Sequence, residues 1–130
     1  MDTSAVIAII ADEPEGGAFA AKLSAAPQPI TSPLVILEAV MRLSSLLNLK
    51  PDEAETLVRD LIAEAGVWVA PIDDTTARHA VAAYAAYGKG RGHPARLNIA
   101  DCMTYACARD HGVPLLFKGD DFSRTDIERA

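Results

Sequence analysis

Cysteine is scarce in this chain of 130 residues, which has only two. Cys102 and Cys107 lie five positions apart in one predicted helix, where they cannot easily form a disulfide. No Cys-x-x-Cys or Cys/His metal pattern surrounds them. We therefore expect two buried free thiols and no zinc site.

Long apolar runs are also missing. No stretch approaches the roughly 20 apolar residues that a membrane helix requires. The first residues lack the basic region, long apolar stretch and small-residue cleavage site of a signal peptide. These absences predict a cytoplasmic protein without a membrane partner.

Basic charge is in deficit. Twelve Lys and Arg residues stand against eighteen Asp and Glu residues, a formal net charge of -6. Affinity for the phosphate backbone comes mainly from Lys and Arg, so this balance argues against a general nucleic-acid-binding surface. Any nucleic acid must be held by a local basic patch or by a metal ion.

Apolar residues make up half of the chain, enough for one sizeable core, and we predict a single domain over residues 1–130. Strand-like runs alternate with helical patterns, which favours an α/β fold with a parallel sheet. The first strand is expected to be weak, and Pro14 with Gly16 and Gly17 separates two short helical pieces. The predicted helices cover residues 5–10, 18–26, 33–49, 51–66, 75–88 and 98–112, and the predicted strands fall within 27–33, 67–72 and 114–119.

Acidic residues follow several of these elements. In a parallel sheet with right-handed crossovers, strand C-termini and the N-termini of the following helices gather along one edge. Clustered carboxylates repel one another unless a cation lies among them, and hard oxygen ligands favour Mg²⁺ or Mn²⁺. The acids at such junctions are Asp2, Glu38, Asp101 and the Asp120–Asp121 pair.

Each acid also has a purely structural interpretation. Asp101 suits a helix N-terminus, Glu38 can pair with Arg42 one turn later, and Asp121 can cap a turn. However, Asp101 and Glu38 interrupt the otherwise apolar runs "LNIADCMTYA" and "LVILEAVM". A carboxylate is costly to bury without a cation or a partner, which favours a shared site.

Four segments carry a family resemblance: "MDTSAVIAII", "SPLVILEAVMRL", "AAYAAYGKGRGHPARLN" and "LNIADCMTYACARDHGVPLLFKGDDFSRTDI". Together they resemble the PIN-domain ribonucleases that form the VapC toxin half of VapBC toxin-antitoxin modules. The resemblance implies a three-layer α/β/α fold with a central parallel sheet, and metal-dependent hydrolysis of RNA. It also implies a homodimer and a cognate VapB-type antitoxin, for which the helix pair within residues 32–64 offers apolar surface.

The same resemblance assigns the acids. The family's first acid falls on Asp2, its helix acid on Glu38, the acid of its "NxxDC" segment on Asp101 and that of its "KGxDF" pattern on Asp121. Asp120 is then a variable neighbour. Asp2, Asp101 and Asp121 are expected to hold Mg²⁺ or Mn²⁺ directly or through water, and Glu38 to complete the site. The family has two or three apolar residues before its first acid, whereas Met1 alone precedes Asp2 here.

Substrate contacts are predicted at two places. Ser4 and Thr104 can donate hydrogen bonds to phosphate or water, and the alternative is a hydroxyl satisfied within its own helix. The loop "GKGRGHPARLN" is the most basic segment, and its functional interpretation is RNA binding, against a plain solvated crossover. The basic residues concerned are Lys89, Arg91 and Arg96.

Two other functions fit parts of the sequence. "DTS" and "KGDD" faintly resemble haloacid-dehalogenase-like phosphatases, but the second acid of that motif would fall on Ser4. A non-catalytic module that only binds an antitoxin or a sister subunit is a further alternative. The full set of four acids favours the nuclease.

Overall fold

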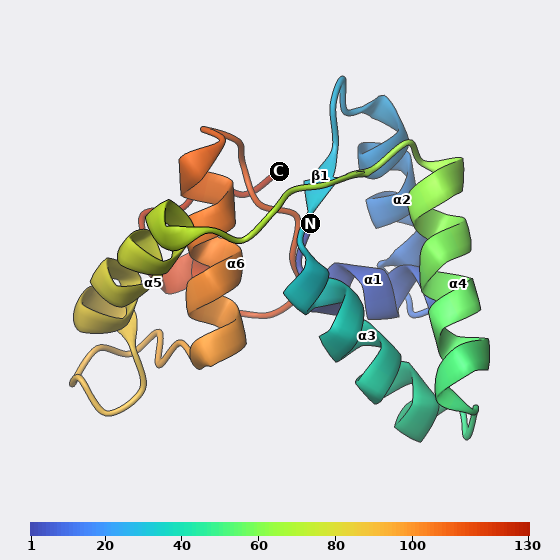
Figure 1. The fold of residues 1–130 in the computed structure, drawn as a ribbon, viewed down its shortest axis with the longest axis horizontal. Coiled ribbons are helices and arrows are strands. Elements are labelled where there is room, and N and C mark those ends of the chain that lie inside the picture. The colour runs from blue at the N-terminus through green and yellow to red at the C-terminus, as the bar shows by residue number, and fades with distance from the viewer.

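The computed structural model describes residues 1–130 and contains six α-helices, two short strands and one 3₁₀ helix. Figure 1 shows their arrangement. The helices agree with those predicted from the sequence, including the two short pieces before residue 26. In chain order the elements are α1 (Thr3–Ile10), α2 (Gly16–Ala25), β1 (Ile30–Thr31), α3 (Pro33–Leu46), α4 (Pro51–Glu64), β2 (Trp68–Val69), α5 (Asp74–Tyr87), α6 (Ile99–Asp110) and η1 (Phe122–Arg124).

Side-chain caps fix where the helices begin. Ser32 precedes α3 and its Oγ accepts a hydrogen bond from the Val35 N–H at 3.4 Å, while Pro33 occupies the first helical position. Asp73 caps α5 in the same way, through the Thr76 N–H at 3.0 Å. These caps satisfy N–H groups that have no partner within the helix, so the predicted starts are confirmed.

The sheet is smaller than expected. Strands β1 and β2 pair in parallel, with Ile30 opposite Trp68 and Thr31 opposite Val69. The prediction of a regular strand over residues 114–119 was wrong, because this segment pairs with its neighbours through only a few backbone bonds. Leu115 forms a single bridge with Arg129, and Pro114 has no N–H to donate.

The N-terminal residues nevertheless occupy the place of a central strand. The Met1 ammonium donates to the Ile30 carbonyl at 2.8 Å, and the Asp2 N–H donates to the Leu116 carbonyl at 2.9 Å. Residues 1–2 therefore lie between β1 and the 115–117 segment. The weak first strand predicted from the sequence is an extended pair of residues.

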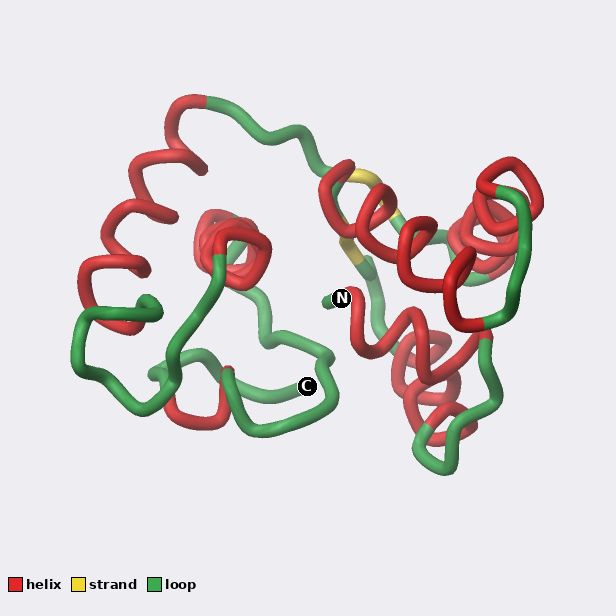
Figure 2. Tube along the Cα trace, turned by 90° about the horizontal axis from the view of Figure 1, so that it is seen from below, coloured by secondary structure: helices red, strands yellow, loops and turns green.

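Helices lie on both sides of these extended segments, so the three-layer α/β/α arrangement is confirmed. Figures 1 and 2 show α5 and α6 on one side and α1 to α4 on the other. One apolar core, including Val6, Leu43 and Val58, joins α1, α3 and α4. A second, including Leu97 and Phe117, packs beneath α5 and α6.

Both cysteines are buried and unbridged, as expected. No helix combines the length and apolar character needed to cross a membrane.

Candidate active site

Asp2 is a buried carboxylate, 7% exposed, at the N-terminus of α1. Its Oδ2 accepts hydrogen bonds from the Ser4 N–H at 2.9 Å and from the Ser4 Oγ at 2.5 Å. Its backbone N–H is bound to Leu116, as described above. The carboxylate is thus fixed where the N-terminal segment turns into a helix.

Glu38 lies half-buried in the second turn of α3. Its Oε2 accepts a hydrogen bond from the Thr3 Oγ at 2.6 Å, which connects α3 to the first residue of α1. No ion pair joins Glu38 to Arg42, and Arg42 is exposed. The i,i+4 pair considered from the sequence is therefore not formed.

Asp101 is half-buried in the first turn of α6, where it forms a reciprocal cap with Asn98. Its Oδ2 accepts from the Asn98 N–H at 2.8 Å, and its own N–H donates to the Asn98 Oδ1 at 3.0 Å. This cap accounts for the side-chain orientation of Asp101. The half-buried carboxylate makes no ion pair with a Lys or Arg side chain.

The pKa of Asp101 is raised to about 6, first by burial and then by the negative charges of Asp2, Asp121 and Glu38, against the lowering effect of the Asn98 hydrogen bond. The charges of Asp2, Glu38 and Asp121 thus reach Asp101, although the four acids are far apart in the sequence. The structure brings them together around the N-termini of α1 and α6.

The Asp120–Asp121 pair follows Gly119, whose φ of 95° is open to glycine and strained for other residues. Both carboxylates are exposed, and Asp121 precedes the 3₁₀ helix η1 without capping it through its side chain. Asp121 is among the charges that raise the Asp101 pKa. The assignment of Asp121 rather than Asp120 to the site stays a prediction.

The carboxylates share a hydrogen-bonding pattern that suits a hard cation. Asp2, Glu38 and Asp101 each use one oxygen for an internal hydrogen bond, and their other oxygens accept none from the protein. No three acidic, histidine or cysteine side chains form a ready-made ligand cage. The charges of Asp2, Glu38 and Asp121 act on Asp101, but in this structure the acids do not form a complete ligand set for one ion.

The two predicted hydroxyl donors differ. Ser4 Oγ donates to Asp2 and accepts from the Lys118 N–H at 2.9 Å, so it holds the site together. Thr104 is 4% exposed and lines a small internal space with Met1 and Thr31. Its hydroxyl is therefore closed off from a phosphate, and the side chain packs α6 against the N-terminal segment.

The basic loop joins α5 to α6 (Figure 1), and Asp101 lies in the first turn of α6. The Lys89 N–H donates to the Leu97 carbonyl at 2.9 Å, which closes the loop at its base. Lys89, Arg91 and Arg96 are all exposed, and none makes an ion pair with an acid of the site. The loop thus presents free positive charge next to the N-terminus of α6.

Three residues of the site were missed by sequence reasoning: Thr3, Asn98 and Lys118. Asn98 had a readable signal, because an Asn three residues before an Asp at a helix start is a capping pattern. Thr3 and Lys118 act through contacts with residues more than thirty positions away, which a single sequence does not display.

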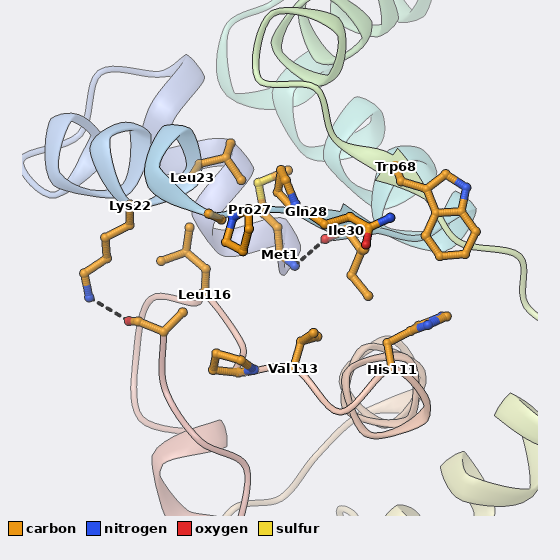
Figure 3. A pocket seen from close by; sticks show the side chains of 14 residues that line it. Met1, Lys22, Leu23, Pro27, Gln28, Ile30, Trp68, His111, Val113 and Leu116 are labelled. Carbon is orange, nitrogen blue, oxygen red and sulfur yellow. Dashed lines mark hydrogen bonds between the residues drawn. The ribbon is translucent and has the colours of Figure 1, made fainter.

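An apolar cavity of about 420 Å³ lies away from the acids, and Figure 3 shows its lining residues. Met1, Ile30 and Leu116 line it, with Trp68 and His111 in edge-to-face contact at one side. None of the four acids borders this cavity, so it has no part in the acidic site.

Comparison with known proteins agrees with this geometry. A family model described as the PIN domain matches residues 1–128. This chain belongs to the PIN-domain family.

Ribonuclease VapC28 of Mycobacterium tuberculosis (strain ATCC 25618 / H37Rv) is 43% identical over 130 residues, covering 100% of this chain and 96% of the relative. VapC ribonuclease R02377 of Rhizobium meliloti (strain 1021) is 39% identical over 138 residues, covering 98% of this chain and 97% of the relative. The resemblance seen in the sequence is confirmed for this PIN-domain protein.

Proposed function

We propose that this PIN domain, spanning residues 1–130, is a divalent-metal-dependent endoribonuclease of the cytoplasm and the toxin half of a VapBC-type module. The observation that carries the proposal is the Asp101 carboxylate, whose pKa is raised to about 6 by burial first and then by the negative charges of Asp2, Asp121 and Glu38. Relatives named VapC ribonuclease, similar over nearly their whole length, support the choice of RNA as substrate.

Asp2, Asp101 and Asp121 would hold Mg²⁺ or Mn²⁺ through their carboxylate oxygens. A bound metal of this kind neutralises the scissile phosphate and lowers the pKa of a water molecule for in-line attack. Ser4 keeps the Asp2 carboxylate in one orientation through two hydrogen bonds to Oδ2. Oδ1 of Asp2 is left free to face the cation.

Glu38 has a different role in this proposal. The Thr3 hydroxyl holds its Oε2, so that Oε1 is available to orient the attacking water and to accept its proton.

Substrate binding is assigned to the basic loop. Lys89, Arg91 and Arg96 would bind phosphates on either side of the cleaved bond, because they are exposed cations of the loop that leads into the helix of Asp101. Their free charge compensates locally for the net charge of -6.

The partners proposed are a VapB-type antitoxin and a second copy of the chain. Exposed apolar side chains on α3 and α4 support a docking surface for an antitoxin helix. They include Leu37, Met41 and Leu46, which are 56%, 64% and 58% exposed.

The decisive experiment is incubation of the purified protein with total RNA in Mg²⁺, in Mn²⁺ and in chelator. Cleavage is expected with metal only, and Asp101→Asn should reduce it at least a hundredfold. Asp60→Asn, an exposed acid on α4, is the matched control and should leave cleavage unchanged. RNA binding without cleavage under every condition would instead identify a non-catalytic module.

A further inference from the structure

The segment that carries Asp121 is held through the residues on either side of it: the Gly119 carbonyl accepts a hydrogen bond from Arg129 at 2.8 Å, and Phe122 is buried against Phe117. Asp121 is exposed, and its side chain makes no capping hydrogen bond to η1. Gly119, two residues earlier, adopts a left-handed backbone conformation at which the chain turns sharply. The position of the Asp121 carboxylate therefore depends on the residues that anchor its neighbours.

Lys118 is the anchor on the N-terminal side of this turn. Its Nζ lies 2.8 Å from Glu13 Oε2 and 3.0 Å from Glu15 Oε2. Its backbone N–H donates to Ser4 Oγ, which in turn donates to Asp2 Oδ2. One residue thus connects the Asp121 segment both to the turn between α1 and α2 and to the Asp2 carboxylate.

The side chain of Lys118 is committed to the two glutamates. Glu13 follows α1 and Glu15 caps α2, so the ammonium group reaches toward that turn. The hydrogen bonds of Glu13 and Glu15 raise the pKa of Lys118, and the Lys118 hydrogen bond lowers the pKa of Glu15. The Lys118 ammonium is thus paired with both glutamates and has no unpaired charge to offer an RNA phosphate.

We propose that Lys118 is a positioning residue of the acidic site, whose ion pairs with Glu13 and Glu15 fix the segment that carries Asp121. The expected effect on catalysis rests on the proposed nuclease function. The anchoring of the segment by Lys118 does not depend on that function. The ion pairs are partly exposed, with side-chain exposures of 38%, 30% and 46% for Lys118, Glu13 and Glu15. Since exposed pairs contribute modestly, the expected effect is a factor of about three to ten rather than loss of activity.

The test compares Lys118→Met with the double variant Glu13→Gln/Glu15→Gln and with the combination of all three. Each should lower kcat for RNA cleavage about three- to tenfold at nearly unchanged KM, with the triple variant no slower than Lys118→Met. Lys118→Arg should restore most of the rate. In the metal-free protein, exchange of the Lys118 amide hydrogen, followed by NMR, should quicken by a similar factor in the Met and Gln variants.

Arg59→Met is the control, because it breaks an exposed ion pair with Glu55 on α4 and should change neither measurement. A raised KM in Lys118→Met with unchanged kinetics in Glu13→Gln/Glu15→Gln would overturn the proposal and make Lys118 an RNA contact. Unchanged kcat and unchanged amide exchange would also overturn it. Failure of the wild-type protein to cleave RNA would refute the proposed function, whereas the exchange measurement would still decide whether Lys118 anchors the segment.

Discussion

Neutralising Asp101 should stabilise the metal-free protein, although it removes a charged group from a helix N-terminus. The pKa of Asp101 rises from an ordinary 3.8 to about 6, mainly through burial and secondarily through the charges of Asp2, Asp121 and Glu38. A difference of about 2 in pKa corresponds to about 3 kcal/mol at pH values above both. Because Asp101 is partly exposed and solvent screens its neighbours, we expect about 1 to 2 kcal/mol.

The sign of this stability difference and its pH range depend on whether the folded or the unfolded state binds the Asp101 proton more tightly. The folded state keeps a proton on Asp101 at pH values where the unfolded chain has already lost it. The stability associated with that proton is therefore present below about pH 4 and is lost as the pH rises through about 6. Asp101→Asn lacks this titration, and its amide oxygen can still accept the Asn98 hydrogen bond. The variant should be more stable than the wild type at pH 7.5, with the difference shrinking toward pH 4.

Urea unfolding in chelator at pH 4.5 and pH 7.5, followed by circular dichroism, measures this difference. Asp60→Asn is the control, since an exposed acid on α4 should leave the midpoint nearly unchanged at both pH values. Addition of Mn²⁺ at pH 7.5 should raise the wild-type midpoint more than that of Asp101→Asn. A variant that is less stable than the wild type at pH 7.5 would refute the argument. The charged cap that Asp101 forms with Asn98 would then stabilise the fold by more than the burial and repulsion of its carboxylate destabilise it.

Three further predictions follow from the contacts described. Asp121→Asn should abolish most RNA cleavage and relieve toxicity to a host cell, while Asp120→Asn retains most activity; equal losses would mean that both carboxylates surround the metal. Thr3→Val removes the donor to Glu38 Oε2 and should cost about 1 to 2 kcal/mol in urea unfolding while lowering kcat, whereas unchanged values would show that this hydrogen bond contributes nothing. Leu43→Ala leaves a cavity at a fully buried position and should cost about 2 to 5 kcal/mol by the same method, and a smaller loss would mean that the core between α1, α3 and α4 can collapse around the gap.

The helices were predictable because their signals are local. Helix starts are indicated by residues only a few positions apart: Ser32 with Pro33 for α3, and Asp73 with Thr76 for α5. The irregular pairing of residues 114–119 was not predictable in this way. The apolar residues of this segment are buried between two layers of helices, but they do not form a regular ladder of backbone hydrogen bonds. Leu115 and Leu116 are buried, yet each pairs through isolated bonds to the chain ends. Burial can be inferred from composition, whereas pairing depends on both ends of the chain, and Asp2 lies more than a hundred residues from Leu116.

The acids of the site were predictable for a related reason. An Asp or Glu within an apolar helix face conflicts with its surroundings, and the conflict is visible in the sequence before any contact is known. What the sequence did not display is how the conflict is managed. Thr3 satisfies one oxygen of Glu38, Asn98 one of Asp101 and Ser4 one of Asp2, so each carboxylate is held while its second oxygen stays free. These hydrogen bonds hold each carboxylate in place and leave its second oxygen available to a cation. Asp121 has no such side-chain hydrogen bond to η1, so we expect its position to depend on the Lys118 anchor.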